Sequence, residues 1–408
     1  MFNPRISHAL LCSLLFCVVG CDSSHDSNNN VVNYNFGLQW SATYPTNDLF
    51  VFEMVDIEYP DIFNKNGSLK ISAMNKDGSQ VNELVSGKVP PFFPKLVAGS
   101  SLSALASVMG YEIWTFDNDL KTYNYYSLPR IFKDEYPDDI SQANFSFLSH
   151  SLLGLDIKNS GAIFHYTECL DTGLNRELFD HSLCKNNLRY NIFSDEKMTI
   201  LHEVLFKPYC SFGEKTEHLT GLSVISQPND SDSLLLIQQS EGIGYHSLFV
   251  YKLPELKLLH EITDTGLINS ITYDFYEDIT NLYIVTTVGV YPDYRTHLCT
   301  LNFFSNGKIQ YDFVEEVDIS QYVDLPGYYN IVWTKYGIVL AGSHNVDEHL
   351  LLDFDIQSKR IEVIDRISAK NNLRGQVSNC GQLFADIDIN GNIRIYDVTN
   401  GAFIRKNI

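Results

Sequence analysis

The sequence predicts an all-β protein built from repeated four-stranded antiparallel sheets, and three observations lead to that prediction. Aromatic residues make up 13% of the 408 residues, with 24 Tyr and 25 Phe, and these side chains favour pleated, half-buried surfaces. Short apolar runs recur between turn signals along the chain, as expected of strands rather than long helices. The runs repeat with a period of roughly 45 to 55 residues, which indicates a series of equivalent units.

The clearest unit is the stretch Gly381–Arg405. Within Leu383–Asp388 every second residue is Leu, Ala or Ile, which is the period of a half-buried strand. Asn390-Gly391 then predicts a two-residue type I′ hairpin turn with positive φ at both residues. Ile393–Val398 forms the return strand, and Asn400-Gly401 turns the chain into a third strand.

The run Gly391–Gly401 resembles the third strand and turn of a WD40 or quinoprotein-like (YVTN-type) blade. Tyr396-Asp397 stands where many such blades carry Trp-Asp. The resemblance is specific over these 20-odd residues and extends to the rest of the chain as a strand pattern. It implies a β-propeller, an architecture of four-stranded blades arranged around an axis.

The repeat itself predicts the number of blades. Three units open their third strand with a histidine, namely His246, His297 and His349. Second strands begin near residues 49, 102, 152, 234, 282, 338 and 383. Seven blades are therefore favoured, with eight as the alternative if the gap after residue 152 holds a degenerate blade rather than an irregular insertion around 168–217. A sandwich or two small barrels would be the rival all-β arrangement, but neither requires a repeat in register.

The strand pattern also predicts the strands of the third unit and two ways in which the ring could close. In the third unit we expect strands at Phe145–Leu148, Leu152–Ile157, Ala162–Tyr166 and Glu177–Phe179. The ring closes either by packing of the first blade on the last or by addition of Val31–Asn35 as a strand of the final sheet. The sequence leaves both modes of closure open.

The first 31 residues predict export and lipid anchoring. Residues 1–20 carry a single arginine, Arg5, before an apolar stretch that is too short to span a bilayer. Val18-Val19-Gly20-Cys21 resembles a bacterial lipobox, which implies acylation of Cys21 and cleavage before it. Residues 21–31 form a polar tether, and residues 32–408 form the propeller domain. Asp22 resembles a signal for retention in the inner membrane, facing the periplasm.

The net charge and the absence of cofactor-binding motifs restrict the classes of partner and cofactor that the sequence predicts. The net charge of −21 argues against nucleic acid as a partner and against docking on anionic lipid through a basic face. The membrane contact is therefore expected through the lipid anchor alone. The sequence contains no phosphate-binding loop, dinucleotide fingerprint or nucleophile elbow, so we predict no cofactor.

Several cysteines are candidates for a disulfide bond. An exported protein meets oxidising conditions, and a disulfide is expected among Cys169, Cys184 and Cys210, which fall in or beside the irregular region. The sequence does not select the pair. Cys299 lies in a predicted third strand and is interpreted as a buried thiol.

Histidines provide two candidate metal groups. The three blade histidines are interpreted as packing residues, because third strands lie far from a propeller's axis. The hairpin loop His344–His349 holds four candidate ligands but no known metal-binding spacing. We therefore predict no metal site.

The leading function from sequence is a protein-interaction scaffold in the cell envelope, with an envelope protein as partner. The alternatives are a lactonase-like propeller hydrolase and a propeller that binds a small ligand or glycan. A hydrolase of that kind would hold a metal in its central channel with carboxylate and amide oxygens. The nearest candidates on predicted inner strands are Asn144, Asn269, Asp274 and Asn330.

Overall fold

The computed structural model covers the full chain, and its description extends to the following residues: 32–40, 49–57, 68–74, 81–88, 95–97, 103–106, 112–116, 123–127, 145–156, 161–170, 184–194, 197–206, 217–226, 233–241, 245–276, 278–289, 293, 295–304, 308–322, 330–341, 347–369 and 372–406. Before residue 152 it concerns the backbone, with the side chain of Trp40 as the exception. The lipobox cysteine, Cys21, lies outside these residues.

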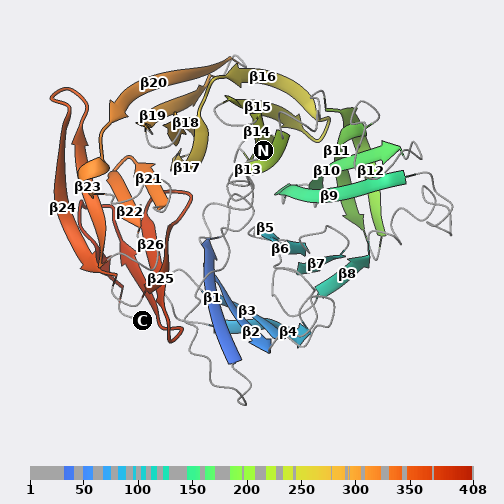
Figure 1. Ribbon diagram of the computed structural model, residues 1–408, viewed down its shortest axis with the longest axis horizontal. Coiled ribbons are helices and arrows are strands. Elements are labelled where there is room, and N and C mark those ends of the chain that lie inside the picture. The colour runs from blue at the N-terminus through green and yellow to red at the C-terminus, as the bar shows by residue number, and fades with distance from the viewer. Residues whose placement is uncertain are drawn as a thin grey trace, which may run out of the picture.

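The described residues form seven four-stranded sheets. Each sheet joins four strands that are consecutive in sequence, and neighbouring strands run antiparallel. We number the sheets as blades 1 to 7 in chain order. Figure 1 shows the blades side by side around a central axis, so that the first and last blades are neighbours. This is a β-propeller, and the predicted fold class is confirmed.

The blades have the following bounds. Blade 1 contains β1 (Val32–Trp40), β2 (Leu49–Ile57), β3 (Ser68–Met74) and β4 (Val81–Lys88). Blade 2 contains β5 (Lys95–Val97), β6 (Ser103–Ala106), β7 (Glu112–Phe116) and β8 (Tyr123–Ser127). Blade 3 contains β9 (Phe145–Asp156), β10 (Gly161–Leu170), β11 (Cys184–Ser194) and β12 (Lys197–Leu205). Blade 4 contains β13 (Glu217–Ser226), β14 (Ser233–Glu241), β15 (Tyr245–Leu253) and β16 (Lys257–Thr263). Blade 5 contains β17 (Leu267–Tyr276), β18 (Asp278–Val288), β19 (Arg295–Phe303) and β20 (Ile309–Val317), followed by a short 3-10 helix, η3 (Ser320–Tyr322). Blade 6 contains β21 (Asn330–Thr334), β22 (Gly337–Ala341), β23 (Glu348–Asp355) and β24 (Arg360–Ser368). Blade 7 contains β25 (Asn372–Val377), β26 (Leu383–Asp388), β27 (Ile393–Asp397) and β28 (Ile404–Arg405).

The hydrophobic cores lie between neighbouring blades. On β14, Leu234 and Leu236 pack against blade 5, whereas Leu235 and Ile237 pack against blade 3. Successive side chains of a strand point to opposite faces of its sheet. A continuous apolar run is therefore what a strand covered on both faces requires, and it explains why these strands do not alternate in sequence.

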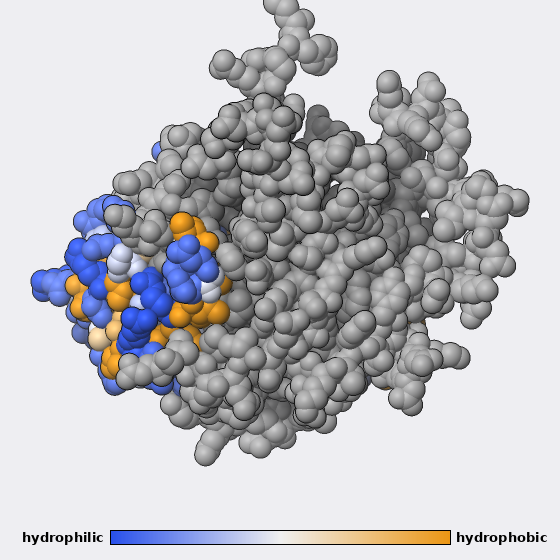
Figure 2. All heavy atoms as spheres, turned by 90° about the horizontal axis from the view of Figure 1, so that it is seen from below, coloured by the Kyte–Doolittle hydropathy of each residue, from blue (hydrophilic) through white to orange (hydrophobic). Residues whose placement is uncertain are grey.

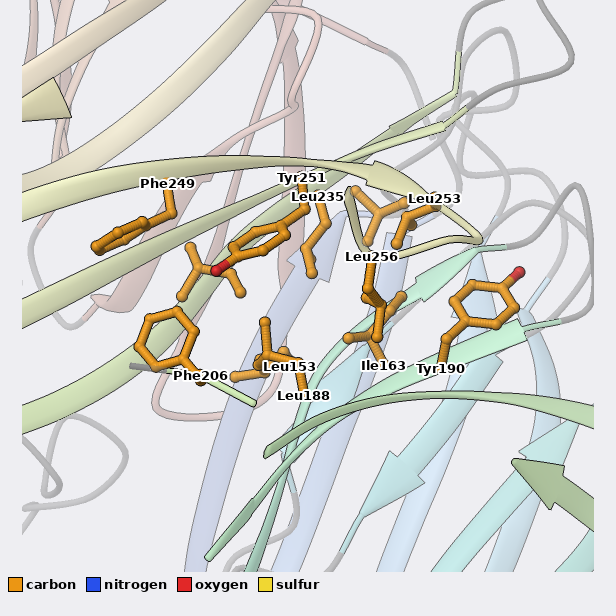
Figure 3. Close-up of a cluster of buried hydrophobic side chains, with 12 residues drawn as sticks. Leu153, Ile163, Leu188, Tyr190, Phe206, Leu235, Phe249, Tyr251, Leu253 and Leu256 are labelled. Carbon is orange, nitrogen blue, oxygen red and sulfur yellow. The ribbon is translucent and has the colours of Figure 1, made fainter. Parts of the chain in front are cut away.

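The core between blades 3 and 4 illustrates this packing (Figure 3). Leu188 of blade 3 lies in this core with Phe249 and Tyr251 of blade 4, and Phe206, which follows β12, packs edge-to-face on Phe249 with 5.3 Å between ring centroids. The backbones also come close at the inner strands, since a Cβ at Gly221 on β13 would collide with the backbone of Leu153 on β9. Glycine is required there because a side chain would push the two blades apart.

The ring closes by packing of blade 1 on blade 7. Trp40, at the end of β1, is 4% exposed and lies in a core with Leu383, Ile387 and Ile395. Its Nε1–H donates a hydrogen bond of 3.1 Å to the carbonyl oxygen of Gln376 on β25. Strand β1 is the first strand of its own sheet, so the first of the two predicted modes of closure is the one observed.

Blade 3 differs from the strands predicted for it. The predicted strands Phe145–Leu148 and Leu152–Ile157 form one strand, β9, because its polar centre, Ser149-His150-Ser151, pairs with β10 and does not break the ladder. Within 168–217, where we expected an irregular insertion, β11 and β12 are the third and fourth strands of this same blade. These strands use the segments that would have formed an eighth blade.

The hairpin turn of blade 7 also differs from its prediction. Gly391 has a φ of +81°, but Asn390 is not among the residues with positive φ. The Gly391 N–H bonds to the Asp388 carbonyl at 3.0 Å, and the Asp388 N–H bonds to the Asn392 carbonyl at 3.1 Å. These bonds define a three-residue loop with glycine in the left-handed position. The Asp388 carboxylate selects it by accepting hydrogen bonds from the N–H groups of Asn390 and Asn392.

Strand β26 was predicted to be half-buried, and this prediction is wrong. Leu383, Ala385 and Ile387 pack toward Trp40, while Phe384 lies in the core shared with blade 6. Asp386 is also fully buried, so a polar position in the pattern does not face solvent. Among the described residues, no helix is long and apolar enough to cross a membrane.

Candidate functional site

The predicted cysteines are partly placed. Cys169 on β10 and Cys184 on β11 are direct partners in the register of two neighbouring strands. Cys210 lies outside the described residues. Cys299 is a buried thiol, and Cys380 is buried with its Sγ 3.3 Å from Ser378 Oγ. Burial raises the pKa of the Cys299 thiol, so that it stays protonated near neutral pH.

Each of the three blade histidines has partners of its own. His246 Nδ1 lies 2.8 Å from Ser240 Oγ, and burial lowers its pKa. His297 Nε2 lies 3.4 Å from a carboxylate oxygen of Glu316, and its ring packs edge-to-face on Phe313 at 5.0 Å between centroids. His349 is fully buried, with Nε2 3.5 Å from Asp386 Oδ2. The three side chains lie on different blades and do not converge.

His344 lies outside the described residues, whereas the other three candidate ligands, Asp347, Glu348 and His349, lie within them. Glu348 accepts a hydrogen bond of 3.1 Å from Arg366 on the neighbouring strand, and His349 belongs to the buried pair with Asp386. No group of three His, Cys, Asp or Glu side chains within the described ranges is arranged to hold a metal ion.

Two of the four channel candidates form hydrogen bonds within or between blades. Asn269 donates a hydrogen bond of 2.6 Å to Thr287 Oγ1 within blade 5. Asn330 on β21 bonds to the Gly375 carbonyl of blade 7 at 3.4 Å. Asn144 and the side chain of Asp274 lie outside the description. The two described amides therefore join neighbouring strands or blades.

Two buried carboxylates hold adjoining blades together. Asp156 on β9 accepts hydrogen bonds from Tyr190 Oη at 2.8 Å and from Ser233 Oγ of blade 4 at 3.0 Å. Asp386 on β26 accepts a hydrogen bond of 2.8 Å from Arg394 Nε and lies beside His349 of blade 6. Hydrogen bonding to Asp386 raises the pKa of Arg394, so the guanidinium stays charged. Both carboxylates therefore stabilise contacts between neighbouring blades.

The sequence did not identify a group of exposed apolar side chains on the outer strands of blades 5, 6 and 7. One large apolar side chain is exposed on each of β20, β24 and β28: Phe313 is 57% exposed, Ile364 40% and Ile404 47%. We call the exposed face of these three strands the outer rim. Figure 2 shows apolar and polar residues interleaved over part of this region of the molecule.

Exposed charged residues lie on the same three strands as these apolar side chains. On β24, the exposed positions beside Ile364 are Arg360, Glu362 and Arg366. Glu316 is exposed on β20, and Arg405 is exposed on β28. Outer strands carry unpaired backbone groups, and charged side chains at such edges prevent pairing with other strands. The outer rim thus has charged residues, which prevent pairing of its edge strands with other strands, and isolated exposed apolar side chains.

Contacts between blades make the outer rim continuous. Lys359, in the turn before β24, pairs with Glu315 of blade 5 at 3.2 Å. The N–H of Phe403 in blade 7 donates to Asp365 on β24 at 2.6 Å. The Phe403 side chain is itself buried in the core between blades 6 and 7. These contacts connect the outer strand of blade 6 with blades 5 and 7.

The chain matches no protein-family model and no curated protein. It is similar to solved structures that include the Dos1 propeller (12% identity, 87% of this chain and 78% of that chain, TM-score 0.40). A chain of a mitotic checkpoint complex matches at 9% identity over 93% of this chain and 98% of its own, with a TM-score of 0.43. An oligogalacturonate lyase in complex with manganese matches at 9% identity over 88% and 95%, with a TM-score of 0.42. At these identities and TM-scores, none of the three says what this chain binds or catalyses.

Proposed function

We propose that this chain is a lipid-anchored protein of the bacterial cell envelope, and that its propeller is a scaffold that binds a protein partner through the outer rim. The observation that carries the proposal is the set of exposed apolar side chains on three consecutive outer strands, Phe313, Ile364 and Ile404. Each lies on a strand that also carries exposed charged residues.

A protein is the partner that best suits this surface. The outer rim carries both signs of charge, with Arg360, Arg366 and Arg405 beside Glu316 and Glu362. Protein interfaces combine apolar and aromatic anchors with arginine and a polar periphery. A nucleic acid or an anionic membrane surface would require a basic face, and the net charge of −21 opposes both.

The envelope location rests on the N-terminal sequence. The apolar stretch, the lipobox and the polar tether would place the propeller beside a membrane with Cys21 as the lipid attachment site. Asp22 favours the inner membrane, facing the periplasm. Metabolic labelling with a fatty acid tests the anchor. Label should enter the wild type and not Cys21→Ala, and equal label in both would refute it.

The outer rim is tested by co-purification from cross-linked membranes. A variant with Phe313→Ser, Ile364→Ser and Ile404→Ser removes the three apolar side chains together. A matched control carries serine at Lys257, Leu258 and Glu261, which are exposed positions on β16 of blade 4 and lie outside the outer rim.

Truncation of interface anchors costs 1 kcal/mol or more at each central position, and about 1.4 kcal/mol is a tenfold change in affinity. The triple variant should therefore recover at least about tenfold less of a partner that the wild type and the control both retain. Equal recovery by the triple variant would remove the outer rim from the proposal.

A further inference from the structure

Cys169 and Cys184 occupy opposite positions at one end of the β10–β11 hairpin. The register of these two strands runs without a shift from Gly161 opposite Ile192 to Cys169 opposite Cys184. Cys184 is the first residue of β11, and Leu170, the residue after Cys169, ends β10. The ladder thus fixes the backbone positions of the two cysteines relative to each other.

Opposite positions in an antiparallel ladder are suited to a disulfide. Their Cα atoms lie about 4.5 Å or about 5.5 Å apart, depending on the type of pair. A disulfide spans Cα separations of about 4.4 to 6.8 Å, so either type of pair permits the bond. We propose that Cys169 and Cys184 form a disulfide across the end of this hairpin in the exported protein.

The other described cysteines are unsuited to this bond. Cys299 lies on β19 of blade 5, and Cys380 lies in the turn between β25 and β26 of blade 7. Both are buried, and both belong to blades other than blade 3. The register thus selects one pair from the three cysteines that the sequence left open.

The loop beyond the two cysteines gives the bond a physical role. Strands β10 and β11 are joined by residues 171–183, a connection much longer than the two to five residues usual for a hairpin. Closing such a loop is entropically unfavourable. A disulfide at its base restricts the unfolded chain and holds the ends of the two strands together.

The chemistry requires an oxidant, for which we name a protein disulfide donor of the envelope. The thiolate of one cysteine attacks the donor disulfide and forms a mixed disulfide. The second thiolate then displaces the donor sulfur, so that the S–S bond forms in this chain. The two cysteines lose two electrons and two protons, and the donor is reduced to a dithiol. The step rests on the export that the proposed function includes.

Peptide mapping of the full-length protein tests the pairing. Trypsin cleavage after Lys158, Arg176 and Lys185 places Cys169 and Cys184 in adjacent peptides, 159–176 and 177–185. We expect these two peptides to be linked in a digest made without reductant, and to separate with a mass gain of about two hydrogens on reduction. Cys210→Ser should keep the linked pair, and Cys169→Ser should lose it.

Two samples test the Cys169–Cys184 pairing separately from export to the envelope. One is the protein from the envelope of cells, and the other is the purified full-length protein incubated with oxidised glutathione. Linkage in both supports the inference. Linkage with glutathione alone supports the pairing and overturns export to an oxidising compartment. Absence of the linked pair from both samples, or linkage of either peptide to the one containing Cys210, overturns the pairing.

Discussion

Trp40 provides the most specific test of ring closure. It is the last residue of β1, and its ring fills a core against β26 and β27 of blade 7. Trp40→Ala would remove the largest side chain of that core. A buried Trp or Phe replaced by Ala costs about 3–5 kcal/mol, a large part of the about 5–15 kcal/mol that stabilises a typical domain.

A second substitution separates packing from hydrogen bonding. Trp40→Phe keeps an aromatic ring but loses the Nε1–H group that donates to the Gln376 carbonyl at 3.1 Å. A hydrogen bond contributes about 0.5–1.5 kcal/mol to stability. Trp40→Phe should therefore lower the free energy of unfolding clearly less than Trp40→Ala does.

Urea denaturation of the purified protein measures both effects. The midpoint should fall in the order wild type, Trp40→Phe, Trp40→Ala, while Leu258→Ala, at a 43% exposed position of β16, should stay within about 0.5 kcal/mol of wild type. Hydrogen exchange should also become faster in β1 and β25. If Trp40→Ala unfolds at the same midpoint as Leu258→Ala, blade 1 does not close the ring on blade 7.

Three further substitutions test local contacts by urea denaturation. Gly391→Val places a β-branched residue at a φ of +81° and should cost about 1–3 kcal/mol, whereas the exposed control Thr263→Val should cost little; equal midpoints would refute the assigned turn. Asp156→Ala leaves two buried hydroxyl groups without their acceptor and should cost at least about 1–3 kcal/mol, with Asp156→Asn milder; no loss in either would exclude the contact between blades 3 and 4. Burial alone would raise the pKa of Asp388, but hydrogen bonds from Asn392 and Asn390 lower it below 3.8. Its stabilisation should therefore be full above pH 3.8 and be lost as the pH falls through the lower folded-state value. Asp388→Asn should reduce the dependence of stability on pH in that window, and an unchanged dependence would contradict the assigned contacts.

The repeat was predictable because strand patterns and turn residues are local signals. The second strands of blades 1, 2, 4, 6 and 7 begin within one residue of their predicted starts, because turn residues separate the strands in sequence. In blade 3, the polar residues Ser149-His150-Ser151 suggested a break, yet they pair along β9. Hydrogen bonding to a neighbouring strand is a non-local property, so the sequence pattern could not reveal it.

The turn in blade 7 shows how side-chain contacts override a local rule. Asn390-Gly391 is a strong signal for a two-residue turn, but the Asp388 carboxylate selects a longer loop by binding two backbone N–H groups. The alternative loop places a positive φ at glycine alone. Glycine accepts this conformation more readily than asparagine does.

The outer rim could not be located from sequence for a similar reason. Strand β24, Arg-Ile-Glu-Val-Ile-Asp-Arg-Ile-Ser, alternates in burial along its whole length. Its apolar residues Ile361 and Val363 face blade 5, while Ile364 is exposed. The exposure of Ile364 follows from the position of β24 as the outermost strand of its blade, which depends on the packing of the whole ring.

The most direct test of the proposed scaffold is photo-cross-linking from a single position in living cells. A photoreactive amino acid replaces Ile364 on the outer rim or, as a control, Glu261, which is exposed on the outer strand of blade 4. The account predicts a discrete cross-linked protein at position 364 that is absent at position 261 and is lost when Phe313 and Ile404 are both changed to serine. No cross-linked protein at position 364, or the same product from both positions, would contradict it.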